Sequence, residues 1–207
     1  MSKNILIIED TPAVSQAIET GLELSTQFSF VSKIATGYTD YASQGLFKQS
    51  FDLGIIDLRF ETPGVDESWG IEIGNATIFG LAKNHPNTPL VVYSGHPEIP
   101  NVVRAMQVGA SDFVPKSHIP PHELVTIVEQ KLFQYELNRQ REQNSKAILE
   151  HRSEEWIQKY GKGSIVALHE GNVVAVGEEW VEVSAKYCNL RLQKHPAWPV
   201  EPEWHQI

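Results

Sequence analysis

Runs of apolar residues alternate with segments of helical spacing through the first 120 positions of the chain. The apolar runs are rich in β-type residues, and they predict strands at 5–8, 28–35, 51–58, 89–94 and 111–116. The segments between them repeat apolar residues every three to four positions, and they predict helices at 12–24, 38–48, 71–83 and 100–108. Strands that alternate with helices form βαβ units, so we expect an α/β fold with a parallel sheet.

The first of these helices has a recognisable start. Thr11 is expected to be its N-cap, and Pro12 stands at the first helical position. Val14, Ile18 and Leu22 are expected on its apolar face, with Leu24 as a further candidate.

A segment without Gly or Pro, 122–160, predicts one long helix. Its beginning carries an apolar stripe that closes the first unit, whereas 138–146 is wholly polar and is expected to lie in solvent. Such a helix is expected to hold the C-terminal part of the chain away from the first unit. The alternative is a compact monomer in which the helix breaks near Asn138 and folds back. Apolar residues return at Ile148, Trp156 and Ile157, and the sequence offers them no obvious partner in so small a module.

The last part of the chain changes to β-type runs around the turn Glu170-Gly171-Asn172, which predicts a hairpin. The segment 178–192 is expected to form a helix, and either this helix or a second subunit is expected to cover the hairpin, because a two-stranded hairpin alone is marginal in water. Its packing residues are expected to be Trp180, Val183 and Tyr187, with Cys188 as a small core residue. The tail from 195 onward is rich in Pro and Trp, and is expected to be irregular. The predicted divisions are therefore 1–136, a helical linker at 137–160, and a small α+β module at 161–207.

Charge and cysteine content exclude several classes of protein. The chain has 17 Lys and Arg against 26 Asp and Glu, which gives a formal net charge of -9. So acidic a chain, without a basic recognition helix near its end, is not expected to bind DNA directly. A single cysteine cannot form an internal disulfide, and no stretch approaches the roughly 18 apolar residues of a membrane span. We therefore expect a soluble cytoplasmic protein that does not enter membranes.

Residues that could bind a ligand or take part in a reaction stand where the predicted strands end. They are Glu9 and Asp10 after the first strand, Asp57 in the third, Ser94 in the fourth and Lys116 in the fifth. In an open parallel sheet, ligands bind at the carboxyl ends of the strands, so this pattern predicts a site at that edge.

Three carboxylates at one site repel one another unless a cation lies between them. Oxygen ligands at this density suit Mg²⁺, which favours phosphate partners. A carboxylate beside Mg²⁺ is able to attack a phosphoryl group and form an acyl phosphate. Ser94 would then donate a hydrogen bond to a phosphoryl oxygen, and the Lys116 ammonium would neutralise its charge. The histidines show no zinc-binding spacing, because His118 and His122 flank two prolines.

These residues, together with the segment 109–116 (GASDFVPK), resemble the receiver domain of two-component response regulators over about residues 3–135. The resemblance implies a flavodoxin-like (βα)5 fold with strand order 2-1-3-4-5, in which the first and third strands are neighbours. It also implies a role for each matching residue: Glu9 and Asp10 as the acidic Mg²⁺ pair, Asp57 as phosphoacceptor and metal ligand, the carbonyl of Arg59 as a further metal ligand, Ser94 as switch hydroxyl, Phe113 as switch aromatic, and Lys116 as the site lysine.

One feature departs from the family pattern. Receivers place a glycine about eight residues after the phosphoacceptor, whereas Gly70 lies thirteen residues after Asp57. The loop is thus about five residues longer and includes Glu61, Asp66, Glu67 and Trp69. The sequence allows two interpretations of these extra residues: an insertion without function, or one that alters access to the site. It also allows two interpretations of His96, either as a loop residue or as one that tunes dephosphorylation.

The resemblance implies a switch that is phosphorylated on Asp57 by a sensor histidine kinase or a phosphotransfer protein. It is not expected to be an enzyme beyond self-dephosphorylation. Its output is expected through contact with an unidentified downstream protein, and the unpartnered apolar residues favour a homodimer. A receiver-fold scaffold is the alternative, and transcription control through another DNA-binding protein is a third reading. The final segment resembles a small, uncharacterised hairpin-plus-helix family that implies no activity.

Overall fold

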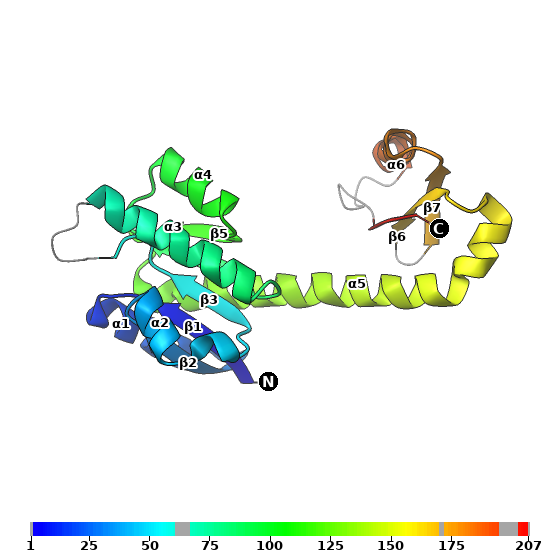
Figure 1. Cartoon of the computed structure of the whole chain (residues 1–207). Coiled ribbons are helices and arrows are strands. Elements are labelled where there is room, and N and C mark those ends of the chain that lie inside the picture. The colour runs from blue at the N-terminus through cyan, green and yellow to red at the C-terminus, as the bar shows by residue number, and fades with distance from the viewer. Residues whose placement is uncertain (1, 61–66, 170–171, 195–202, 207) are drawn as a thin grey trace. The chain divides into compact units, whose positions relative to one another are not determined.

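The computed structural model describes residues 2–60, 67–169, 172–194 and 203–206. The chain divides into two compact units, 1–135 and 136–207. In the first unit, a parallel sheet of five strands lies between helices on both of its faces (Figure 1). The order is β2-β1-β3-β4-β5, which confirms the predicted flavodoxin-like fold.

The observed elements follow the predicted order along the chain. The strands are β1 (Ser2–Ile8), β2 (Ser29–Ala35), β3 (Leu53–Ile56), β4 (Leu90–Ser94) and β5 (Asp112–Pro115). The helical elements are α1 (Pro12–Glu23), α2 (Tyr38–Ser43), the 3₁₀ turn η1 (Leu46–Lys48), α3 (Glu67–Asn84), α4 (Ile99–Gln107), the 3₁₀ turn η2 (Pro121–Glu123) and α5 (Leu124–Tyr160).

The strands are continuously apolar because both faces of the sheet are covered. On β1, Ile5 and Ile7 face a core that includes residues of α1 and α5. Leu6 and Ile8 alternate with them and face the other core, which includes residues of α2, α3 and α4. These two cores fix the register of the strands, because a slip by one residue would exchange the two faces of a strand.

Thr11 is the N-cap of α1 and Pro12 its first residue, as predicted, although the Thr11 side chain makes no capping hydrogen bond. Two local expectations for this unit are wrong. Leu24 lies just beyond the end of that helix and is 71% exposed, so it is not part of the apolar face. The predicted helix at 38–48 is two elements, because Gly45 adopts a left-handed conformation (φ +68°) between α2 and η1.

The second unit contains an antiparallel sheet of order β7-β6-β8. Its elements are β6 (Ile165–His169), β7 (Asn172–Gly177), α6 (Trp180–Lys194) and β8 (Glu203–Gln206). The predicted hairpin is confirmed by the pairing of β6 with β7. The expectation of a wholly irregular tail is wrong, because β8 pairs with the free edge of β6.

Packing in this unit corrects the expected roles of several side chains. Val183 and Tyr187 are buried against Ile165 of β6, as predicted, but Trp180 is 49% exposed. Cys188 is exposed, because it follows Tyr187 directly and a helix turns successive side chains to different faces.

The opposite face of β6 is covered by the end of α5. Trp156 is 2% exposed and packs on Val166 and Leu168, so the expectation that it lacks a partner within the module is wrong. Ile157 is half-buried. The side chain of Ile148 lies outside the described residues.

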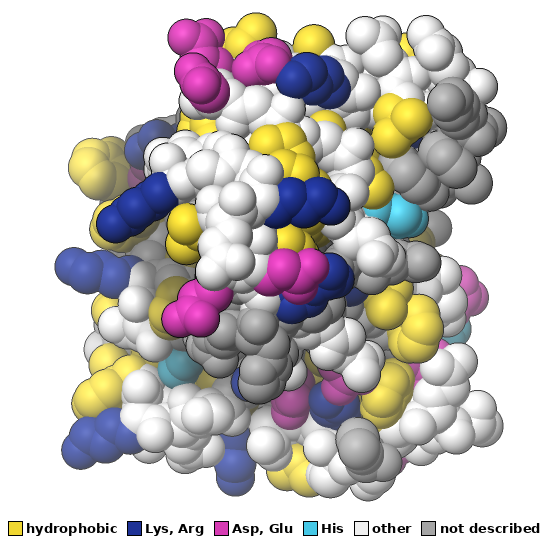
Figure 2. All heavy atoms as spheres, turned by 90° about the vertical axis from the view of Figure 1, so that its right-hand side faces the viewer, with side chains coloured by type: hydrophobic (Ala, Val, Ile, Leu, Met, Phe, Trp, Pro, Cys, Tyr) yellow, Lys and Arg dark blue, Asp and Glu magenta, His cyan; other side chains and the backbone are white. Residues whose placement is uncertain are grey.

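Charged groups of both signs are spread over the surface. In Figure 2, acidic, basic and hydrophobic side chains are interspersed, and no continuous basic surface is seen among the described residues of that face. The helices described here include none with the length and apolar character required to cross a bilayer.

A buried histidine makes the stability of the first unit dependent on pH. His85 follows α3 and is 8% exposed; its Nε2 lies 2.6 Å from the hydroxyl of Tyr41, and its ring meets that of Phe51 edge-on. Burial lowers the pKa of His85 below its ordinary value of 6.5. The native state therefore holds a neutral imidazole at pH values where the unfolded chain is already protonated.

We expect the free energy of unfolding in urea to fall as the pH decreases from about 6.5 towards the depressed pKa of His85. The loss is about 1.4 kcal/mol for each unit by which folding lowers this pKa. His85→Gln is expected to flatten this part of the pH profile, whereas His118→Gln, at an exposed histidine, should leave it unchanged. An unaltered profile in His85→Gln would contradict the assignment.

Candidate functional site

The carboxyl edge of the parallel sheet gathers the polar residues that the sequence singled out. β1 and β3 are paired so that Ile8 lies opposite Ile56, and the next residue of each strand is acidic. The backbone N–H of Asp57 donates to the carbonyl of Ile8 at 2.8 Å, which holds Asp57 beside Glu9. Glu9 is 2% exposed and Asp57 is 7% exposed. Two carboxyl groups are therefore held side by side and nearly out of contact with water.

Asp10 completes an acidic cluster at this edge. Glu9, Asp10 and Asp57 each offer one carboxylate oxygen, and these atoms lie within 4.8 Å of one another. Hard oxygen donors at this spacing match the preference of Mg²⁺ for one or more carboxylates completed by water and phosphate oxygens. The donor set therefore fits Mg²⁺.

Lys116, the residue directly after β5, brings a positive charge into the same cluster. Its backbone N–H donates to the carbonyl of Ser94 at 2.8 Å, which ties it to the end of β4. Its Nζ donates to Glu9 Oε2 at 2.8 Å and to Asp57 Oδ2 at 2.9 Å. The same Nζ lies 5.5 Å from the centre of the Tyr93 ring. One ammonium thus bridges two buried carboxylates.

The electrostatics of the cluster follow from burial and close approach. Burial raises the pKa of Glu9, and the charge of Asp57 raises it further, while Lys116 and the N–H of Thr11 act against this. Burial alone would lower the pKa of Lys116, but Asp57 and Glu9 outweigh it and hold that pKa above its ordinary value. Lys116 therefore stays cationic at neutral pH.

The remaining predicted site residues lie around this cluster. Ser94 is fully buried as the last residue of β4, and its Oγ accepts a hydrogen bond from the N–H of His96 at 3.2 Å. The N–H of Arg59 lies 3.4 Å from Asp57 Oδ1, so the Arg59 backbone adjoins the acceptor carboxylate. Phe113 on β5 is partly buried against the core that includes Ile56. The roles predicted for Ser94, Arg59 and Phe113 stay predictions, as does the open reading of His96.

Gly74 is a residue of the site that the sequence analysis did not single out. A Cβ at this position would lie 1.7 Å from the carbonyl oxygen of Leu58, so α3 rests directly on the backbone that follows Asp57. A glycine inside a helical pattern is the sequence signal of such a close approach. Tyr93 was also missed; its hydroxyl donates to the carbonyl of Ile119 at 2.7 Å and thereby fixes the ring beneath Lys116.

The segment after Asp57 was predicted to be a loop as far as residue 70, and this is wrong in part. α3 begins at Glu67, so Trp69 and Gly70 belong to its first turn. A Cβ on Gly70 would lie 2.9 Å from the carbonyl oxygen of Phe60. The predicted acidic positions Glu61 and Asp66 lie outside the described residues.

The strand order and the cluster of acids with a lysine at the carboxyl edge define a class of protein, the CheY-like receivers. The model of the response regulator receiver domain matches residues 5–129, and the chain belongs to this family.

Two curated relatives are similar over the same region. The C4-dicarboxylate transport transcriptional regulatory protein DctD of Rhizobium meliloti is 30% identical over 116 residues, covering 55% of this chain and 22% of DctD. The nitrogen assimilation regulatory protein NtrX of Azorhizobium caulinodans is 28% identical over 140 residues, covering 68% of this chain and 28% of NtrX. The matched region is thus less than a third of the length of either relative.

Solved structures share the fold. A CheY-like receiver domain protein from Methanospirillum hungatei superimposes with a TM-score of 0.54 at 20% identity, covering 67% of this chain and 99% of that one. NtrX from Brucella abortus gives a TM-score of 0.54 at 24% identity, covering 68% of this chain and 29% of that one.

Proposed function

We propose that this chain is a response regulator in which Asp57 accepts a phosphoryl group, with Mg²⁺ as the required ion, from a sensor histidine kinase or a phosphotransfer protein. The observation that carries the proposal is the bridge from Lys116 Nζ to Glu9 and Asp57, within a cluster that already holds three carboxylates. A fold that served only as a scaffold would gain little from burying these charges, because the desolvation cost of a buried ion pair can exceed its Coulombic gain.

The proposed transfer uses the carboxylate oxygens of Asp57. One of them forms a bond to phosphorus while the bond from phosphorus to the donor's histidine nitrogen breaks, and the electron pair of that bond stays with the nitrogen. Glu9, Asp10, Asp57 and the carbonyl of Arg59 would hold Mg²⁺, which supplies neutralisation of the phosphoryl oxygens when bound. Lys116 Nζ, 2.9 Å from Asp57 Oδ2, would pair with another of these oxygens.

Phosphorylation then changes the interactions at the ends of β4 and β5. A phosphoryl group adds roughly -1.5 to -2 charge and strong acceptor oxygens. Ser94 Oγ would turn to donate to one of these oxygens, and its side chain would move towards Asp57. Phe113, on the adjacent strand, would fill the space that Ser94 leaves. The switch is proposed to reach the surface through α4 and β5.

Hydrogen exchange tests this switch in the full chain. With Mg²⁺ and beryllofluoride, which mimics the phosphoryl group, we expect slower amide exchange in α4 and β5. Ser94→Ala should still bind beryllofluoride but show a smaller change. Ser111→Ala is the matched control, because Ser111 lies at the amino end of β5 and donates to the carbonyl of Leu90. Equal exchange with and without beryllofluoride would contradict the switch.

The output is proposed to be a protein contact, including a homodimer, made by the surface of α4. Ile99, Val103 and Met106 recur at helical spacing on this helix and are 79%, 48% and 43% exposed. Exposed apolar stripes of this kind are typical of interaction surfaces. DctD is named a transcriptional regulatory protein, which favours control of transcription as the downstream process; direct DNA binding is no part of the proposal.

Sedimentation of the full chain tests the dimer. We expect dimers in the presence of Mg²⁺ and beryllofluoride, and monomers for Val103→Glu, because a carboxylate on an apolar interface lacks a partner. Val31→Glu is the matched control, since Val31 is 46% exposed on β2, far from α4 in the sheet order. A parent protein that is monomeric at micromolar concentration, both with and without Mg²⁺ and beryllofluoride, would contradict the dimer and leave the phosphorylation proposal intact.

A further inference from the structure

Tyr93 is a buried aromatic residue at the end of β4 that the proposed phosphoryl transfer does not use. It directly precedes Ser94, the last residue of the strand. Successive side chains of a strand point to opposite faces of a sheet, so Tyr93 and Ser94 face different sides. Tyr93 is 1% exposed and belongs to the core that α1 and α5 cover. The end of β4 therefore places a second side chain beside the site, on the α5 side of the sheet.

The ring of Tyr93 lies beside the ammonium of Lys116. The distance from Lys116 Nζ to the ring centre is 5.5 Å, within the range of about 6 Å over which a cation is attracted to an aromatic face. The same ammonium donates to the buried carboxylates of Glu9 and Asp57. The attraction between a cation and a ring is strongest where water is excluded. The ring of Tyr93 therefore helps to define where this ammonium lies.

The hydroxyl of Tyr93 holds the segment between β5 and α5. It donates to the carbonyl of Ile119 at 2.7 Å. Burial raises the pKa of Tyr93, so the hydroxyl keeps its proton at neutral pH. Ile119 is followed by Pro120 and Pro121, which have no backbone N–H, and α5 begins at Leu124. One side chain thus joins the site to the chain just before α5.

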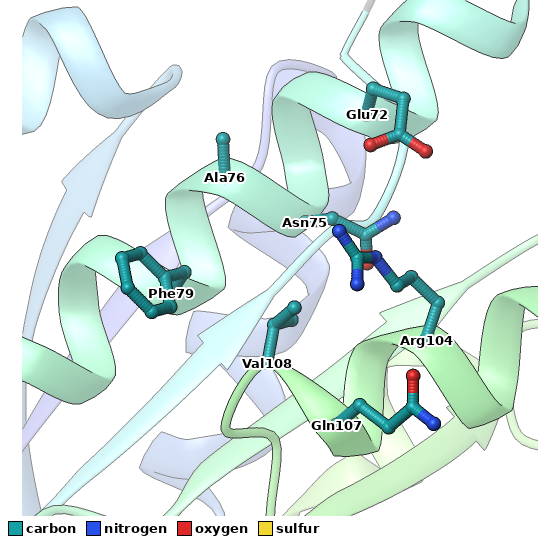
Figure 3. Close-up of a pocket in the computed structure, with 7 residues that line it drawn as sticks. All are labelled: Glu72, Asn75, Ala76, Phe79, Arg104, Gln107 and Val108. Carbon is teal, nitrogen blue, oxygen red and sulfur yellow. The ribbon is translucent and has the colours of Figure 1, made fainter.

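The helices on the two faces of the sheet pack differently. α3 and α4 leave a hollow of about 450 Å³ between them, lined by residues that include Phe79 and Arg104 (Figure 3). On the other face, Leu124 and Val128 of α5 are fully buried in the same core as Tyr93. Closely packed side chains transmit a displacement because a protein interior is hardly compressible. A movement of Tyr93 therefore acts on the start of α5.

We propose that Tyr93 is a positioning residue that couples Lys116 to the start of α5. Its ring holds the ammonium where it meets the phosphoryl group, and its hydroxyl passes a displacement of the ring to the carbonyl of Ile119. The proposal rests on the proposed phosphorylation of Asp57, because the phosphoryl oxygens are what would draw Lys116 Nζ away from Asp57 Oδ2. α5 continues into the second unit as one helix, so this route is separate from the α4 surface.

Two substitutions in the full chain separate the ring from the hydroxyl. Tyr93→Leu removes both and should slow the incorporation of labelled phosphate from acetyl phosphate by at least about tenfold. Tyr93→Phe keeps the ring and should restore the rate of the parent. The proton resonance of the Lys116 ammonium, assigned by its absence in Lys116→Ala, should show a ring-current shift in the parent and in Tyr93→Phe. This shift should be lost in Tyr93→Leu.

Amide chemical shifts test the hydroxyl. In the parent, Mg²⁺ and beryllofluoride should shift the amides of residues 122–128 as well as those of α4 and β5. In Tyr93→Phe the response at 122–128 should be lost, while the response of α4 and β5 is kept. Tyr41→Phe is the matched control, because it removes an equally buried hydroxyl that lies 2.6 Å from His85 Nε2 on the other face of the sheet. It should keep both responses.

A parent protein that takes up no phosphate would contradict the phosphorylation of Asp57. The ammonium resonance of Lys116 is measured without phosphorylation, so it decides on the role of the ring in that case too. The proposal would be overturned by a Lys116 resonance that is the same in Tyr93→Leu as in the parent, or by a Tyr93→Phe rate as low as that of Tyr93→Leu. An unaltered beryllofluoride response at 122–128 in Tyr93→Phe would also overturn it.

Discussion

Asp57→Asn is expected to reduce phosphoryl incorporation from acetyl phosphate to background. The amide has no carboxylate oxygen with which to form the acyl phosphate, and it also removes one of the two carboxylates that Lys116 contacts. The measurement is incorporation of labelled phosphate in the presence of Mg²⁺, with and without excess chelator. The chelator is expected to abolish incorporation in the parent protein, because it removes the Mg²⁺ that Glu9, Asp10 and Asp57 would hold.

Asp52→Asn is the matched control for this experiment. Asp52 precedes β3 and accepts from the N–H of Asn4, so it lies at the opposite, amino edge of the sheet. This variant should incorporate phosphate as the parent does. Incorporation that persists in Asp57→Asn, or in the parent protein with chelator, would show that the modified residue lies elsewhere.

Removing Lys116 is expected to have the largest effect on stability. Lys116→Ala leaves Glu9 and Asp57 buried without their counter-ion, and breaking a buried pair from one side costs on the order of 3 kcal/mol. We expect the free energy of unfolding in urea without Mg²⁺ to fall by about this amount. Lys131→Ala is the control, because its ion pair with Asp112 is partly exposed and should contribute less than about 1 kcal/mol.

Mg²⁺ and acid should both reduce the deficit of Lys116→Ala. A divalent cation binds only the folded acidic cluster and so stabilises it, and the variant is expected to retain metal binding while losing phosphoryl transfer. The pKa of Glu9 is already raised by burial in the folded state, so its charge is most costly at neutral pH and is relieved as the pH falls through that raised pKa. A deficit that does not change with Mg²⁺ or with pH would mean that Lys116 acts through packing alone.

The acidic site was predictable because its residues are placed by strand ends. Lys116 is 107 positions from Glu9 in the sequence, yet both stand at the same edge once five apolar runs are assigned to one parallel sheet. The order of the strands could not be derived from the runs themselves; it came from the resemblance to receivers, and the observed β2-β1-β3-β4-β5 order confirms it.

Features that depend on tertiary contact were not predictable in this way. β8 has no alternation of apolar and polar residues, and it is a strand because β6 offers it a free edge about 40 positions earlier in the chain. Trp156 is buried by β6 rather than by a second chain, because the hairpin strands have two faces and α6 covers only one of them. Asn75 Oδ1 is buried without a hydrogen-bond partner among the described residues, and the sequence gives no signal of this, since an asparagine in a helical pattern is ordinary until its surroundings are known.

The close packing of α3 on the segment after Asp57 bears on protein engineering. Phe60 is 5% exposed, and its carbonyl adjoins Gly70, while Leu58 is held against Gly74. The backbone on either side of residues 61–66 is therefore fixed by contacts that do not involve those residues. Because loop length adds little to the free energy of closure, this position should accept a shortened connection or an inserted epitope tag or fluorophore-binding peptide. A reporter inserted between Phe60 and Glu67 would leave Glu9, Asp10 and Asp57 unchanged, so it could be used to follow the acidic cluster without altering its carboxylates.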